Sequence, residues 1–150
     1  MYVALGVKPD GQRQVLGFWL FGAEGESSQN WKTILRELWD RGVRKVEVFI
    51  SDDLPGIEEA IREVFPNAKW QLCVVHAVRD ALAKVRKANR EAMTQDLKRI
   101  YRADTLEQAH EALEAFKRVW AQKYPKIVAK WTQKSYALLE FLNHPKAIRP

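Results

Sequence analysis

Hydrophobic and polar residues alternate with a short period at the start of the chain. Residues 2–7 (YVALGV) and 14–20 (QVLGFWL) are two runs rich in β-branched and aromatic residues. The sequence Lys8-Pro9-Asp10-Gly11 between them suits a tight turn, because proline presets its own φ and glycine accepts a positive φ. This pattern predicts a β-hairpin.

The segment after the hairpin has the apolar spacing of a helix. A polar loop at residues 22–28 precedes it, and Ser27 or Ser28 can cap the start of the helix. Gly42 suits the left-handed position after its end. The apolar positions recur every three or four residues, which indicates one buried helical face: Trp31, Ile34, Leu35, Leu38 and Trp39.

Two further predicted strands flank a short helix. Residues 45–51 (KVEVFIS) are apolar enough for a buried, central strand, and residues 69–75 (KWQLCVV) predict a second strand. Between them, residues 57–64 predict a helix with Pro55 in its first turn, and residues 65–67 end it. A strand–helix–strand unit of this length favours a parallel pair with a right-handed crossover.

The second half of the chain shows helical periodicity only. Apolar residues keep a helical spacing from Val78 until Asn143-His144-Pro145, and residues 105–108 form a capping-box pattern inside this region. We therefore predict an α/β fold with the order β-hairpin, α, β, α, β over residues 1–76. An all-helical region follows over residues 77–150.

Composition narrows the class of protein. Of the 150 residues, 47% are hydrophobic and 29% are charged, which is typical of a globular chain. The longest apolar run is too short for a transmembrane helix, and residues 1–7 do not resemble a secretion signal. The single cysteine, Cys73, excludes an internal disulfide and a multi-thiolate metal site. These features predict a cytoplasmic protein with no membrane partner.

Charge is distributed unevenly along the chain. The net charge is +6, but residues 1–75 carry −2 and residues 76–150 carry +8. A basic half of this kind indicates a polyanionic partner such as DNA, and the alternative is a solvated helical surface. The candidates for contacts to a DNA backbone are eight basic residues: Arg79, Lys84, Arg86, Lys87, Arg90, Lys98, Arg99 and Arg102.

Two adjacent aspartates, Asp52 and Asp53, follow directly after the predicted strand at residues 45–51. Open α/β sheets bind ligands at the carboxyl ends of their strands, and carboxylates there can hold a hard divalent metal. The alternative is that one of the two caps the helix at residues 57–64. A phospho-acceptor pocket would require βα alternation to continue, and the helical second half argues against it.

A Cys-x-x-His pair, Cys73 and His76, lies at the end of the predicted strand at residues 69–75. Two ligands cannot complete a tetrahedral zinc site, and His110 and His144 do not have ligand spacing. The pair favours a buried thiol and a histidine that caps or hydrogen-bonds at a strand–helix junction. A cysteine nucleophile is not indicated, because nothing in the sequence marks an orienting partner or an oxyanion donor.

Several motifs are specific enough together to indicate a family. They are Ser-Asp-x-Leu-x-Gly from Ser51, Phe-Pro-x-Ala-x-x-Gln-x-Cys-x-x-His from Phe65, and His-Pro-x-x-Ile-Arg from His144. Longer stretches connect them, among them YVALGVKPDGQRQVLGFWL and DLKRIYRADTLEQAHEALEAFKRVWAQKYPKIVAKW. In this order, and over nearly its whole length, the chain resembles the Mutator-type transposases of bacterial insertion sequences.

The resemblance implies an RNase H-like catalytic core of the DDE type, with a mixed sheet followed by an all-α insertion. In this family three acidic residues hold two Mg²⁺ or Mn²⁺ ions for DNA cleavage and strand transfer. The second of these falls on Asp52, with Asp53 as an additional candidate ligand where the family usually has glycine. The family signature falls on Cys73 and His76. The implied partners are transposon-end and target DNA in the nucleoid, contacted by the basic helices.

The resemblance also implies that two catalytic acids lie outside this chain. The first family aspartate lies on a central strand before Tyr2 and the glutamate lies after Pro150, so we expect the chain alone to be inactive and to bind no metal tightly. Without that strand, either the hairpin pairs with residues 45–51 or an open edge recruits a second copy. The competing function is a non-enzymatic remnant that binds DNA or a full-length transposase through its basic helices.

Overall fold

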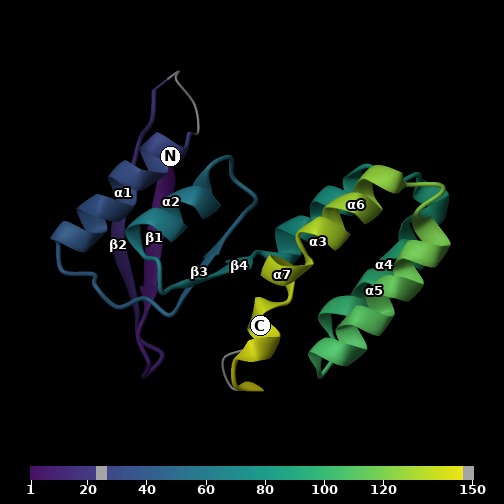
Figure 1. The fold of residues 1–150 in the computed structure, drawn as a ribbon. Coiled ribbons are helices and arrows are strands. Elements are labelled where there is room, and N and C mark those ends of the chain that lie inside the picture. The colour runs from purple at the N-terminus through teal and green to yellow at the C-terminus, as the bar shows by residue number, and fades with distance from the viewer. Residues whose placement is uncertain (23–26, 147–150) are drawn as a thin grey trace. The chain divides into compact units, whose positions relative to one another are not determined.

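The structure is a computed structural model that describes residues 1–22 and 27–146 (Figure 1). Part of the predicted loop at residues 22–28, and Ile148 and Arg149 of the last motif, lie outside the described residues. The chain divides into two compact units. The first comprises Met1–Phe49 and Leu54–Ala68, and the second comprises Ile50–Asp53 and Lys69–Pro150. The fold is mixed α/β, as predicted.

The predicted β-hairpin is present in the first unit. Strand β1 (Tyr2–Val7) pairs antiparallel with β2 (Arg13–Trp19), and the register shifts once, between Ala4 and Leu5. The connecting turn is closed by the Gly11 amide, which donates to the Lys8 carbonyl oxygen at 2.9 Å. Gly11 has a φ of 84°, which is the conformation that glycine was expected to supply.

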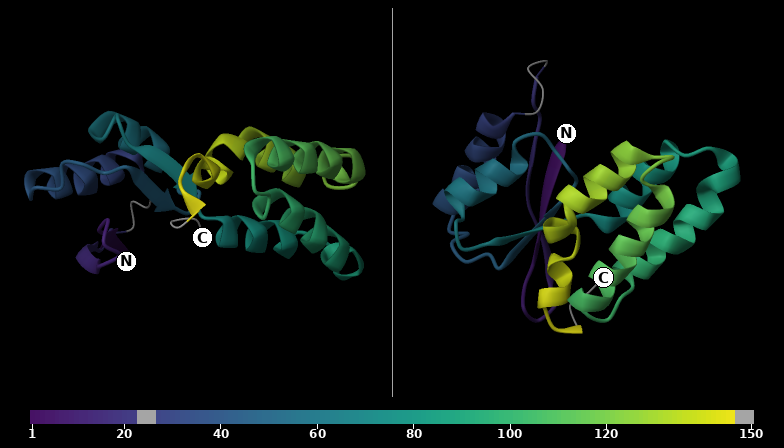
Figure 2. Two further views of the ribbon diagram at one scale, coloured as in Figure 1. Left: turned by 90° about the horizontal axis from the view of Figure 1, so that it is seen from below. Right: turned by 45° about the vertical axis from the view of Figure 1, so that its right-hand side comes forward.

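Two helices cover one face of the hairpin, α1 (Ser28–Asp40) and α2 (Ile57–Val64) (Figures 1 and 2). The Ser27 hydroxyl accepts a hydrogen bond from the Asn30 amide, so the predicted cap of α1 is confirmed. The Tyr2 ring meets the edge of the buried Trp31 ring with centroids 4.7 Å apart, which joins β1 to α1. The two helices thus bury their apolar faces within this unit.

A lysine on α1 joins the two helices electrostatically. Lys32 Nζ lies 2.8 Å from Glu59 Oε1 and 2.7 Å from Glu63 Oε2 on α2. The hydrogen bonds to Glu59 and Glu63 raise the pKa of the Lys32 ammonium, although partial burial opposes this. The same lysine lowers the pKa of both carboxyls. All three groups are therefore held in their charged forms at neutral pH.

Only glycine fits at position 56, where α2 begins close to the start of α1. Its φ is 77°, and a Cβ there would overlap the backbone of Ser28. We expect Gly56→Ala to lower the free energy of unfolding by about 2 kcal/mol or more, since the variant meets both a backbone penalty and a steric clash. Urea unfolding followed by circular dichroism measures the change.

Gly42 provides the matched control for this substitution. Its φ is 105°, but a Cβ there would meet no atom within 4 Å. Gly42→Ala should therefore cost only the backbone penalty, about 1 kcal/mol. Equal losses for the two variants would show that the contact with Ser28 does not limit the packing of α2.

The other face of the hairpin is apolar and exposed. Its side chains include those of Val3, Leu5, Val7, Val15 and Phe18, with Phe18 68% exposed. Pairing between the hairpin and residues 45–51, one of the two expected alternatives, is not found in the described chain, where β1–β2 and β3–β4 form separate two-stranded sheets. Strand β3 (Val48–Ser51) is also shorter than predicted.

The expected burial of residues 45–51 is wrong. Val46, Val48 and Phe49 are half-buried, and Ile50 is 71% exposed. The physical reason is that β3 has one neighbouring strand in the described chain, β4 (Lys69–Leu72), so it is not central. The apolar composition of this strand therefore does not predict how deeply its side chains are buried in this chain.

Helices form nearly all of the second unit, as the periodicity predicts (Figure 1). Strand β4 ends earlier than expected, because the chain enters a helix directly after Cys73. The helices are α3 (Val74–Ala83), α4 (Lys87–Tyr101), α5 (Leu106–Trp120), α6 (Pro125–Gln133) and α7 (Ser135–Leu138), followed by a 3₁₀ turn at Glu140–Asn143. No described helix is both long and apolar enough to span a membrane.

The core of the second unit draws on all of these helices. Its largest fully buried side chains are those of Leu72, Met93, Leu97, Ile100, Phe116, Leu138 and Leu139. The Thr105 hydroxyl accepts from the Gln108 amide, as the capping-box pattern predicts, and the Gln108 side chain accepts from the amide of the preceding residue, Asp104. This core anchors β4 and α3, which carry the candidate site.

Candidate functional site

Hydrogen bonds hold the end of β3 beside the start of α3. The Cys73 amide donates to the Ser51 carbonyl oxygen at 2.7 Å. The indole of the buried Trp70 donates to the Ser51 hydroxyl at 2.9 Å, which connects β4 to the same residue. Asp52 follows Ser51, so its position next to the first turn of α3 is fixed by both contacts.

The structure brings Asp52, Cys73 and His76 together in one cluster. His76 Nδ1 lies 2.8 Å from Asp52 Oδ1 and 3.1 Å from Cys73 Sγ. One oxygen, one sulfur and one ring nitrogen from the three residues all lie within 4.8 Å of one another. Cys73 occupies the position before the first residue of α3, without a side-chain cap bond, and His76 is three residues later, so both lie at the first turn of that helix. The cluster faces solvent, since the Asp52 side chain is 46% exposed and that of His76 is 56% exposed.

The cluster does not have the geometry of a catalytic triad. In a triad the histidine uses one ring nitrogen for the nucleophile and the other for the carboxylate. Here Nδ1 of His76 contacts both Asp52 and Cys73. Asp52 is a partner of His76 that the sequence did not reveal, and both Asp52 and Cys73 contact the same ring nitrogen of that histidine.

The donor atoms of Asp52, Cys73 and His76 differ from those that a magnesium ion prefers. Mg²⁺ requires octahedral coordination by oxygen atoms, usually from carboxylates and water. The cluster offers one carboxylate, from Asp52, together with a thiol and an imidazole. The described residues of the cluster therefore do not by themselves match a magnesium site.

Asp53 is held by basic side chains of the second unit. Its carboxylate lies 3.2 Å from Lys130 Nζ and 3.7 Å from Lys134 Nζ. Lys130 also lies 3.3 Å from Asp80. Partial burial lowers the pKa of Lys130, but the hydrogen bonds to Asp53 and Asp80 outweigh it, so the pKa lies above its ordinary value.

The alternative that an aspartate caps α2 is wrong. The cap residue of α2 is Gly56, without a side-chain hydrogen bond, and Pro55 precedes the helix instead of lying in its first turn. Asp52 turns to His76, and Asp53 turns to the lysines of the second unit. The two adjacent carboxylates therefore have different environments.

The candidate DNA-binding residues lie on α3, α4 and the residues that flank α4. All are exposed except Lys98, which is half-buried. Two of them have acidic partners on their own helix or turn: Lys84 lies 3.7 Å from Asp80, and Arg99 lies 3.3 Å from Asp96. The exposure of this set is compatible with a binding surface and with a solvated helical face.

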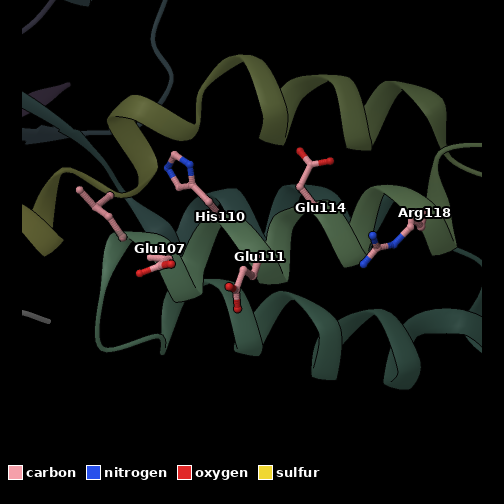
Figure 3. A pocket seen from close by; sticks show the side chains of 6 residues that line it. Glu107, His110, Glu111, Glu114 and Arg118 are labelled. Atoms are coloured by element: carbon pink, nitrogen blue, oxygen red, sulfur yellow. The ribbon is translucent and has the colours of Figure 1, made fainter.

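A shallow hollow on α5 is a separate feature of the second unit. It is lined by side chains from consecutive turns of the single helix α5: Leu106, Glu107, His110, Glu111, Glu114 and Arg118. Figure 3 shows that the five labelled side chains, those of Glu107, His110, Glu111, Glu114 and Arg118, point in different directions. Because these groups do not converge on a common point, the hollow offers no assembled chemistry.

Sequence reasoning missed two features of the site. It treated Asp52 separately from Cys73 and His76, although pairing of the strands before them would have placed their ends side by side. It also did not include Lys130 and Lys134, which lie more than 70 residues after Asp53. The helical spacing of Lys130 and Lys134 does not indicate that either one pairs with an acidic residue far away in the sequence.

The chain is similar in sequence to a known family of proteins. The family described as "Transposase, Mutator family" matches residues 1–150. The transposase for insertion sequence element IS905 from Lactococcus lactis is 36% identical over 148 residues, and that for ISRM3 from Rhizobium meliloti is 37% identical over 150 residues. The transposase for IS1201 from Lactobacillus helveticus is 34% identical over 149 residues.

These alignments cover unequal shares of the two proteins. They include 99% of this chain but only 37% of the IS905 and ISRM3 proteins and 40% of the IS1201 protein. The chain thus spans about two fifths of the length of these curated relatives. With the family matched from the first residue to the last and relatives above 30% identity over nearly the whole chain, the protein belongs to the Mutator family of transposases.

Proposed function

We propose that this chain is part of the catalytic core of a transposase that cleaves DNA at transposon ends and transfers the strands to a target. The observation that carries the proposal is the position of Asp52, which lies directly after β3 in a chain of the Mutator family. An RNase H-like fold, with residues 1–76 as a partial core and residues 77–150 as a helical insertion, agrees with the order of its elements.

In this proposal Asp52 supplies one carboxylate to the metal centre of a longer polypeptide. The other acidic ligands of the DDE set would come from segments that the relatives contain and that these 150 residues do not include. Bound Mg²⁺ or Mn²⁺ would activate the attacking oxygen and stabilise the leaving oxygen of the DNA phosphodiester. The contribution of this chain is to hold Asp52 in place through the contacts of Ser51 with Cys73 and Trp70.

Metal removal tests the proposed activity. An intact transposase that contains this chain should nick DNA carrying its transposon ends when Mg²⁺ is present, and a chelator should reduce cleavage to background. Readdition of Mg²⁺ or Mn²⁺ should restore it. Cleavage that continues in excess chelator would overturn the metal-dependent mechanism, and a gel-shift assay in chelator confirms that the DNA is still bound.

We also propose that the basic helices bind the DNA backbone. The support is the net charge of +8 over residues 76–150 and the exposure of the candidate residues on α3 and α4. Contacts to phosphates release counterions, so raising the salt from 50 to 200 mM should weaken binding by roughly a thousandfold or more if about six phosphates are contacted. Fluorescence anisotropy with labelled duplex DNA measures this slope.

Two sets of charge variants test whether DNA binding depends on the basic residues of α3 and α4 or on positive charge anywhere on the chain. Arg86 and Lys87 are exposed and have no acidic partner among the described ion pairs, and Lys8 is an exposed basic residue in the hairpin turn. Changing Arg86 and Lys87 to glutamine should reduce the salt slope by about two, and Lys8→Gln should leave it unchanged. A flat salt response of the parent chain would overturn the proposed DNA surface.

The second candidate function is non-enzymatic. It is favoured by the single carboxylate of the cluster and by the exposed apolar face of β1 and β2, which suits a protein partner such as a second copy or a full-length transposase. In that case the chain would bind DNA or transposase in the cytoplasm and would not cleave. A chain that inhibits the intact enzyme without nicking DNA itself would support this function over the first.

A further inference from the structure

We propose that Asp52, Cys73 and His76 bind one transition-metal ion of the Zn²⁺ or Co²⁺ class. This inference concerns the same carboxylate as the proposed function, but it rests on the geometry of the cluster and does not require DNA cleavage. The residues supply three kinds of donor atom: a carboxylate oxygen, a thiolate sulfur and an imidazole nitrogen. Such a mixed set is the ordinary ligand chemistry of zinc in proteins.

The spacing of the donor atoms suits a tetrahedral ion. Bond lengths of about 2.0–2.3 Å to zinc place neighbouring tetrahedral donors roughly 3.3–3.6 Å apart. The observed separations are 2.8 Å from His76 Nδ1 to Asp52 Oδ1 and 3.1 Å from His76 Nδ1 to Cys73 Sγ, and all three donors lie within 4.8 Å. A metal ion would need to spread these two pairs by about half an ångström each, and the third pair, between Asp52 and Cys73, would need to adopt the same spacing within its 4.8 Å bound. Half-exposed side chains can make adjustments of this size.

The donors are attached to ordered parts of the second unit. The backbone of Asp52 is held through Ser51, which contacts both Cys73 and the buried Trp70. Cys73 and His76 share the first turn of α3, and the Cys73 side chain is not used to cap the helix. The geometry of the site is therefore set mainly by backbone contacts, and only short side chains have to adjust.

The donor set also predicts selectivity between metals. A thiolate and an imidazole favour Zn²⁺ and Co²⁺, whereas Mg²⁺ prefers an all-oxygen shell that the cluster does not provide. Three protein ligands leave the fourth tetrahedral position open to water or another ligand, and the exposure of Asp52 and His76 permits this. The ion would connect the carboxyl end of β3 to the start of α3.

Cobalt absorption tests this proposal directly. The 150-residue chain, without a histidine tag and under reducing conditions, would be titrated with Co²⁺ in the absence of DNA. Cys73 is the single cysteine, so a sulfur-to-cobalt charge-transfer band must arise from it. We expect this band to saturate at one Co²⁺ per chain, to disappear when Zn²⁺ is added, and to persist in excess Mg²⁺. Absence of the band, or its loss in Mg²⁺, would overturn the proposal.

Variants distinguish a three-ligand site from metal binding by the thiol alone. Asp52→Asn and His76→Ala should each weaken Co²⁺ affinity at least about tenfold, and Cys73→Ser should remove the band. Asp53→Asn is the matched control, because Asp53 contacts lysines and not the cluster, and it should leave the affinity unchanged. If Asp52→Asn and His76→Ala bind Co²⁺ like the parent, the site is wrong. Circular dichroism verifies that each variant is folded.

The outcome is independent of the proposed DNA chemistry. Failure of cobalt binding in the isolated chain would remove the mixed-ligand site and leave the chelator experiment on the intact transposase unaffected. Conversely, an intact protein that does not cleave DNA could still contain a chain that binds Co²⁺ through Asp52, Cys73 and His76.

Discussion

Replacing Asp52 by alanine in an intact transposase that contains this chain is expected to abolish DNA cleavage at the transposon ends. Loss of a carboxylate that holds a catalytic metal should reduce the rate by roughly a thousandfold or more, because the charge that develops on the phosphodiester is no longer stabilised. DNA affinity should stay nearly the same, since Asp52 is acidic and is not part of the basic helices. Single-turnover cleavage and anisotropy measure the two quantities separately.

Asp53→Ala provides the neighbouring control for Asp52. The Asp53 carboxylate is held by Lys130 and Lys134, so its loss should change cleavage far less than loss of Asp52. An Asp52→Ala protein that still cleaves at the parent rate would remove this residue from the mechanism. Equal inactivation by both substitutions would indicate that the two adjacent carboxylates act together and that their different contacts do not separate their roles.

Replacing Gln71 by leucine is expected to lower the free energy of unfolding by roughly 2–5 kcal/mol. The Gln71 side chain is buried on β4, where its amide nitrogen donates to the Leu138 carbonyl oxygen at 3.0 Å and its oxygen accepts from the Phe141 amide at 2.7 Å. Leucine has a similar volume but leaves both backbone groups buried without these partners, and each costs about 1–3 kcal/mol. Urea unfolding measures the loss.

Gln95→Leu is the matched control for Gln71. Gln95 is exposed on α4, and its side chain donates to Glu91 on the same helix. The same change of side chain there should alter stability by less than about 0.5 kcal/mol, since water can replace the lost partner. A Gln71→Leu chain as stable as the Gln95→Leu chain would show that the network between β4 and the C-terminal turns does not stabilise the second unit.

The local elements could be predicted because their causes are local. The Lys8–Gly11 turn, the Ser27 cap of α1, Gly42 after it and the Thr105–Gln108 capping box all act within a few residues of the chain. The buried face of α1 could also be predicted, since helical periodicity determines which side chains share a face. The family could be predicted because its motifs are sequence patterns, and the matching relatives confirm it.

Strand burial could not be predicted in the same way. An apolar strand is buried only if other strands and helices cover it, and this depends on which segments pair. Residues 45–51 have the composition of a central strand, yet Ile50 is largely exposed because β3 has a single neighbouring strand in the described chain. The separate hairpin sheet likewise followed from pairing and not from composition.

The candidate site shows the same division between local and tertiary information. The sequence by itself determined that Asp52 follows a strand and that Cys73 and His76 share a helical turn, because both are properties of neighbouring residues. Only the tertiary structure brought the carboxylate of Asp52 to His76, and it turned Asp53 to lysines more than 70 residues away. Those contacts depend on strand pairing and helix packing, which join residues that no local pattern connects.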